Sequence, residues 1–203
     1  MRVRRTILST IGTGIAIAAL SSGSAVAAPP LPTEDSAKYP ASKGYYFVDD
    51  KIDMPAGSAC SGAVTIEVIG HQRDYVNGEL VDPTKEPAPA LGDRMKSQAP
   101  DEFVIVTNTA TGQSVTKKIN GTLRGTVVDV SNDGVLDLKF VGKGRNSYFG
   151  PGITGIVFAA GKQNLTVTDF TNPEGYRLSL ATKGKRIDLC RKIGLQPVPG
   201  QLV

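Results

Sequence analysis

The chain has 203 residues, with 23 lysines and arginines against 19 aspartates and glutamates, and 40% of its residues are hydrophobic. Three of the basic residues (Arg2, Arg4 and Arg5) lie in an N-terminal segment that we expect to be removed, which leaves 20 basic against 19 acidic residues and lowers the net charge from +4 to +1. Such a nearly neutral chain gives no electrostatic reason to predict nucleic-acid binding, and its length is enough for one domain with a hydrophobic core.

Residues 1–28 have the pattern of a bacterial secretory signal peptide. The basic start precedes an apolar run over residues 7–20, and small residues lead to cleavage after Ala27 or Ala28. The apolar run is too short for a permanent membrane span, so we expect no stable membrane insertion after cleavage. The arginine pair also approximates a twin-arginine signal, which leaves two export routes open. We predict a secreted protein that is extracellular or associated with the cell wall.

Residues 29–43 are rich in proline and polar side chains, and we predict a flexible leader. A single domain at residues 44–191 follows, with a C-terminal tail at residues 192–203. Within the domain, short apolar or alternating runs are separated by Gly, Asn, Asp and Pro, which is typical of strands. The runs are Tyr45–Val48, Ala63–Ile69, Glu102–Thr107, Ser114–Ile119, Leu123–Val130, Val135–Val141, Gly155–Ala159, Leu165–Phe170, Tyr176–Ala181 and Arg186–Cys190.

These runs predict an all-β fold. Because most connections after residue 102 are short, neighbouring runs should pair as an antiparallel meander of about 9–10 strands. Such a sheet can bury its apolar faces either as a β-barrel or as a β-sandwich, and the sequence does not choose between them. The glycine-rich stretch over residues 141–155 leads into another strand, so we expect a wide connection there and no phosphate-binding loop.

Cys60 and Cys190 are the two cysteines of the chain. Export places them in an oxidising compartment, so we predict one disulfide in preference to a reactive thiol. Closing so long a loop would stabilise the fold by about 5 kcal/mol in the chain-entropy estimate.

Residues 70–100 interrupt the strand rhythm, and we interpret them as a long polar loop or insert. Asn77-Gly78 could turn a small hairpin within it. Long loops on a β scaffold often bind ligands, so His71, Arg73, Asp74 and Tyr75 are candidate ligand-binding residues. His71 is the single histidine of the chain, and the simplest interpretation is a solvent-exposed loop residue.

The stretch DVSNDGVLDLKF at residues 129–140 has two interpretations. Asp129, Asp133 and Asp137 are weak candidates for calcium ligands, but Phe140 occupies the position where a calcium loop needs a carboxylate. A hairpin explains the alternating residues on both sides, so we favour it and predict no metal and no cofactor.

Four stretches, CSGAVTIEV, VTNTATGQSVTKKINGT, the glycine-rich run leading to ITGIVFAAGK, and RIDLC, resemble a group of small exported all-β proteins of actinobacteria without a named activity. The resemblance covers about residues 58–191. It implies an all-β domain whose early and late cysteines pair, and it carries over no catalytic residue.

The predicted function is that of a secreted, non-catalytic cell-envelope or extracellular binding protein. Its ligand could be a small apolar molecule inside a barrel, or a cell-surface protein or glycan held by the long loop. The alternative is a hydrolase or isomerase with acidic residues inside a β-barrel, drawn from Glu67, Glu102, Asp129 and Asp137.

Overall fold

The computed structural model describes residues 30–81, 89–130, 133–172 and 175–201, so the predicted signal peptide lies outside the described part. The elements are a 3-10 turn η2 (Ala41–Lys43), the strands β1 (Tyr46–Met54), β2 (Val64–Val76), β3 (Glu79–Leu80), β4 (Arg94–Gln98), β5 (Phe103–Asn108), β6 (Ser114–Lys118), β7 (Thr122–Val128), β8 (Asp137–Tyr148), β9 (Val157–Thr168) and β10 (Arg177–Asp188), and a short helix α2 (Leu189–Lys192).

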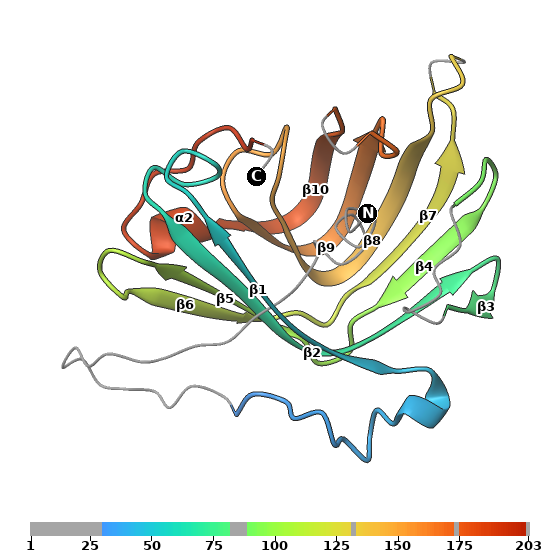
Figure 1. Cartoon of the computed structure of the whole chain (residues 1–203), viewed down its shortest axis with the longest axis horizontal. Coiled ribbons are helices and arrows are strands. Elements are labelled where there is room, and N and C mark those ends of the chain that lie inside the picture. The colour runs from blue at the N-terminus through green and yellow to red at the C-terminus, as the bar shows by residue number, and fades with distance from the viewer. Residues whose placement is uncertain (1–29, 82–88, 131–132, 173–174, 202–203) are drawn as a thin grey trace.

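The described strands form one ten-stranded antiparallel sheet, which confirms the predicted fold class. Its order is β10-β9-β8-β7-β4-β2-β5-β6, and β1 and β3 also pair with β2. β5 and β4 pair with successive parts of β2. Figure 1 shows the resulting curved sheet. The sheet curls strongly but does not close into a barrel, so the predicted apolar site inside a barrel has no closed wall around it.

A line of glycines lies at one level of the three long neighbouring strands β8, β9 and β10. Gly144, Gly161 and Gly184 are register partners in β8, β9 and β10, and all have positive φ angles of 87°, 109° and 127°. A Cβ on Gly161 would lie 2.6 Å from the carbonyl oxygen of Lys183, so only glycine allows the strands to approach here. We call these three residues the glycine crease.

The glycine crease corrects the interpretation of residues 141–155 as a wide connection. Residues 141–148 continue strand β8, and the connection is confined to residues 149–156. The glycines therefore mark a bend inside a paired strand, which a sequence pattern does not distinguish from a loop.

Two hydrophobic clusters lie on the inner side of the curved sheet. The first is built around β2 and β5 and includes Ile66, Val104 and the disulfide-linked cysteines. The second is built around β7, β8 and β9, with Leu138, Phe140 and Leu165 as members. Alternate residues of these strands point inward, as the two-residue period predicts.

The predicted disulfide joins Cys60 to Cys190, with 5.6 Å between the two Cα atoms. It links the loop before β2 to helix α2, which lies beside that loop in Figure 1. The Asp188 side chain caps this helix by accepting the backbone N–H of Cys190, and Pro197 of the C-terminal tail forms an isolated bridge with Cys60. Together these contacts hold the end of the last strand against the first half of the sheet. No helix in the described ranges is long and apolar enough to span a membrane.

The prediction of a long polar loop over residues 70–100 is wrong for residues 70–76, 79–80 and 94–98, which lie in strands, and residues 82–88 lie outside the described part. Strand β2 continues to Val76, and residues 94–98 form β4, which pairs with both β2 and β7. The polar side chains belong to strands with one solvent-facing side, so polarity alone did not indicate a loop. The predicted turn at Asn77-Gly78 is confirmed, with φ angles of 53° and 92° in the β2–β3 hairpin.

Candidate anion-binding surface

His71 is a buried residue of β2, so its interpretation as an exposed loop histidine is wrong. Its ring Nδ1 lies 3.2 Å from Asp101 Oδ2, and its Nε2 lies 3.3 Å from the carbonyl oxygen of Glu34. The ring also packs beside Tyr39 and Phe47, with centroid distances of 5.3 Å and 5.2 Å. Part of the predicted leader therefore lies over β2 and covers the histidine. Whether the leader is flexible in solution stays a prediction.

The other three candidates from this stretch of β2 divide between the two faces of the sheet. Asp74 is buried, and its carboxylate accepts hydrogen bonds from the Tyr46 hydroxyl and from Gln72 Nε2. Arg73 and Tyr75 point to the opposite face, where the Arg73 guanidinium lies 4.5 Å from the Tyr45 ring centroid and 5.6 Å from that of Tyr75. The structure thus leaves only Arg73 and Tyr75 toward the outside.

A buried carboxyl pair lies inside the fold. Glu102 is fully buried, and neither of its carboxyl oxygens has a hydrogen-bond partner. Burial first, and then the nearby charges of Asp74 and Asp101, raise the pKa of Glu102 well above its usual range. Burial likewise raises the pKa of Asp74, although hydrogen bonds from Tyr46, Ser97 and Gln72 oppose the shift.

The aspartates considered as calcium ligands hold the β7–β8 connection together. Asp129 accepts the backbone N–H groups of Asp133 and Gly134, and Asp133 accepts that of Val135. Asp137 is buried and accepts two further backbone N–H groups. The described residues contain no group of three or more His, Cys, Asp or Glu side chains able to hold a metal ion. The hairpin is confirmed, although two residues at its tip (131 and 132) lie outside the described part.

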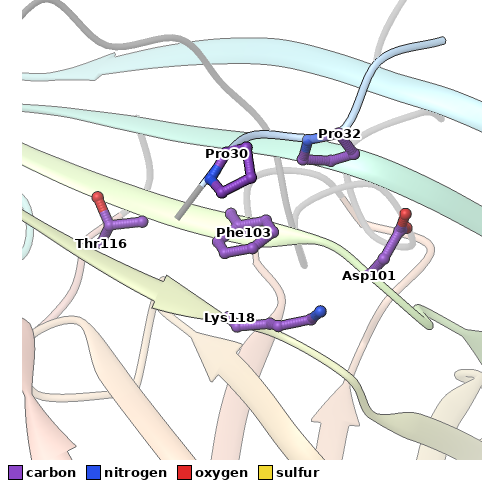
Figure 2. A pocket seen from close by; sticks show the side chains of 6 residues that line it. All are labelled: Pro30, Pro32, Asp101, Phe103, Thr116 and Lys118. Atoms are coloured by element: carbon purple, nitrogen blue, oxygen red, sulfur yellow. The ribbon is translucent and has the colours of Figure 1, made fainter. Parts of the chain in front are cut away.

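One groove lies between the N-terminal segment and strands β5 and β6. Figure 2 shows Pro30 and Pro32 beside Phe103, with Lys118 on the other side of the ring. The Lys118 ammonium lies 5.5 Å from the Phe103 ring centroid. Asp101 and Thr116 complete the lining, so this groove is largely apolar and carries one charge of each sign.

A different face of the sheet has a strongly one-sided charge. Strands β4, β7, β8, β9 and β10 contain eleven basic residues, and their two acidic residues are the buried Asp137 and the helix-capping Asp188. Seventeen of the chain's 19 acidic residues therefore lie outside these five strands. The basic residues are Arg94, Lys96, Arg124, Lys139, Lys143, Arg145, Lys162, Arg177, Lys183, Lys185 and Arg186.

Strand register places most of these cations on the side opposite the core. In β8, Leu138, Phe140 and Gly142 are buried, whereas Lys139 and Lys143 are exposed. In β9, Lys162 is likewise exposed beside the buried Gln163. We call the outward positions of β4, β7, β8, β9 and β10 the basic face. The one acidic side chain at such a position is Asp137 at the start of β8, which is buried and accepts the backbone N–H groups of Val130 and Asp169.

Two arrangements concentrate charge on the basic face. Lys143, Lys162 and Lys183 are direct register partners in three neighbouring strands, immediately beside the glycine crease. A second group of cations lines a groove, whose walls include Tyr75, Arg94, Lys96, Arg124 and Lys139.

The electrostatics of the groove agree with its composition. Partial burial first, and then the positive charges of Arg124 and Arg73, lower the pKa of Lys96. The Lys96 ammonium lies 4.4 Å from the Tyr75 ring centroid, so its environment is partly apolar. An anion bound in this groove would offset the repulsion among these cations.

Sequence reasoning missed the basic face because it averaged charge over the whole chain. The stretch LDLKFVGKGR at residues 136–145 does place Lys139, Lys143 and Arg145 at positions of one alternating set, opposite to Leu138 and Phe140. Pairing that alternation with strand order would have shown a shared face.

Comparisons with protein-family models, with curated proteins and with solved structures found no match to this chain. The resemblance to exported actinobacterial proteins therefore stays a prediction, and the candidate surface is argued from geometry and charge alone.

Proposed function

We propose that this chain is a secreted, non-catalytic binding protein whose ligand carries repeated negative charge and is held on the basic face. The observation that supports this proposal is the segregation of charge: eleven cations lie in five adjacent strands whose outward positions include no exposed acid. A surface of one sign raises the local concentration of oppositely charged ligands and speeds their association.

The position of the carboxyl groups supports binding over hydrolysis. Glycoside hydrolysis needs two carboxyl groups flanking a bound substrate. Here Asp74 and Glu102 lie inside the fold, whereas the groove on the basic face is lined by cations, Tyr75 and small or aliphatic residues.

The proposal is tested by measuring the affinity of the purified protein for two anionic ligands, inorganic polyphosphate and vesicles containing phosphatidylglycerol. We expect at least one of them to bind, with affinity that falls steeply as salt rises. The triple variant Lys143→Gln, Lys162→Gln, Lys183→Gln should weaken binding by at least about tenfold.

The matched control removes the same charge elsewhere, through Lys43→Gln, Lys117→Gln and Lys192→Gln in η2, β6 and α2. It should change affinity by less than about twofold, because these three lysines lie outside the five strands that form the basic face. Failure of both ligands to bind at low salt, or equal weakening by the two triple variants, would contradict the proposed function.

A further inference from the structure

We propose, resting on the proposed function, that the ligand is a linear polymer of phosphate groups that lies across the strands of the basic face. The track it would follow takes one cation from each of five consecutive strands: Lys96, Arg124, Lys143, Lys162 and Lys183.

Register fixes the course of this track. Lys96 and Arg124 are partners between β4 and β7, and Lys143, Lys162 and Lys183 are partners across β8, β9 and β10. The partner of Arg124 in β8 is Val141, so the track shifts by two residues at this point. Neighbouring strands lie about 4.8 Å apart, so the track is roughly 19 Å long. An extended chain that crosses the strands and shifts by two residues between β7 and β8 would meet a cation at each strand.

Anion binding explains why Lys143, Lys162 and Lys183 are register partners, because like charges placed directly opposite one another destabilise a sheet. No exposed acid lies on the outward side of β8, β9 or β10 to offset the repulsion among Lys143, Lys162 and Lys183, because Asp137 is buried and bonded to backbone N–H groups. One polymer with closely spaced negative charges would neutralise all three ammonium groups. Three separate small anions would do the same only at a larger cost in translational entropy.

The chemistry of the track fits phosphate better than a neutral glycan. Lysine and arginine only donate hydrogen bonds, and phosphate oxygens only accept them. A neutral sugar chain presents donors and acceptors in similar numbers, and aromatic side chains commonly line its binding sites. Only two aromatic residues come near this face among the described residues: Phe158 of β9, which is buried in the first hydrophobic cluster, and Tyr75 of β2, beside Lys96.

The same face is less suited to a lipid surface or to single-stranded nucleic acid. Peripheral membrane binding combines cations with apolar side chains that enter the bilayer. Val141, at 40% exposure, is the one large exposed apolar residue on the five strands among the described residues. Single-stranded nucleic acids are held largely by bases stacked on aromatic side chains, and the one aromatic ring that contacts a cation of this track is Tyr75, beside Lys96.

The experiment compares orthophosphate, tripolyphosphate and inorganic polyphosphates of increasing length by calorimetry or fluorescence titration. We expect affinity to rise with the length of the polyphosphate until the polymer spans the track. For longer polymers, the affinity per binding site should stay constant. Phosphatidylglycerol vesicles and a single-stranded DNA oligomer with the same number of charges should bind more weakly than long polyphosphate.

Salt dependence gives the number of cations engaged. Neutralising five phosphates predicts a slope of log affinity against log salt near −3.5, and the triple lysine-to-glutamine variant should reduce its magnitude by about 2. The melting temperature of this variant should not fall, because the substitutions remove repulsion. A merely structural role of the lysines would lower it.

Three results would overturn the inference. They are equal affinity for tripolyphosphate and long polyphosphate, tighter binding of vesicles or of DNA than of polyphosphate, and an unchanged salt slope in the triple variant. Vesicle binding that is tighter than polyphosphate binding and depends on the three lysines would exclude the linear polymer and leave the proposed function standing. Loss of binding to every anionic ligand would remove both.

Discussion

At the scale of single residues, the fold tolerates one carboxyl group in an unusual environment. Glu102 is fully buried with no hydrogen-bond partner for either oxygen, so the neutral acid is strongly favoured in the folded state. Its raised pKa means that the folded protein keeps a proton that the unfolded chain has already released. The stabilising contribution is complete below the unfolded pKa of about 4.3 and is lost as pH rises toward the folded value.

We therefore predict that Glu102→Gln makes unfolding less dependent on pH above about pH 5 and raises stability at pH 8 by roughly 1–3 kcal/mol. Urea denaturation at a series of pH values measures this. Glu79→Gln, at an exposed position of β3, is the control and should leave the profile unchanged. A variant with the same pH profile as the parent would show that Glu102 does not titrate as its burial requires.

Among the elements, the glycine crease connects fold and site. It bends β8, β9 and β10 at one register level, and the three lysines of the track occupy the preceding or following position in each strand. The bend requires residues without a side chain, because neighbouring backbone oxygens occupy the space of a Cβ.

Gly161→Ala should destabilise the protein by at least about 2 kcal/mol, through an unfavourable positive φ and contact with the Lys183 carbonyl. Gly112 has a positive φ as well, but no atom would lie within 4 Å of a Cβ at this position. Gly112→Ala should therefore destabilise the protein by only about 1 kcal/mol. Thermal or urea unfolding compares the two variants. Equal costs would show that close packing at the crease is not what requires glycine.

At the scale of the whole molecule, strand pairing does not close the curved sheet, and a disulfide holds the end of the last strand against the first half of the sheet. The Cys60–Cys190 disulfide closes a separation of 130 residues and lies within the first hydrophobic cluster. Leu189, the first residue of the helix that carries Cys190, and Ile193, which directly follows this helix, are both fully buried in that cluster.

The double variant Cys60→Ser, Cys190→Ser should lose about 3–5 kcal/mol of unfolding free energy, mainly because its unfolded chain is less constrained. Urea denaturation of the oxidised parent, the reduced parent and the variant provides the measurement. The reduced parent should match the variant, and a parent insensitive to reductant would contradict a stabilising disulfide.

The sequence by itself determined the class of fold, because a two-residue period and frequent turn residues act locally along the chain. Alternation such as Leu136 to Phe140 indicates a strand with one buried face wherever it occurs, and two cysteines in a predicted exported chain have one way to pair. The same local logic correctly favoured a hairpin over a calcium loop at residues 129–140.

Only the tertiary structure decided where the charges meet. The track runs from Lys96 to Lys183, and hydrogen-bond register between strands distant in sequence brings its members together. Likewise, His71 and Glu102 became buried through contacts with residues about 30 positions away or more, such as Asp101 and Glu34 for the histidine. Net charge is a sum over the chain and contains no positions, so a nearly neutral sequence could fold into a sheet with one basic face.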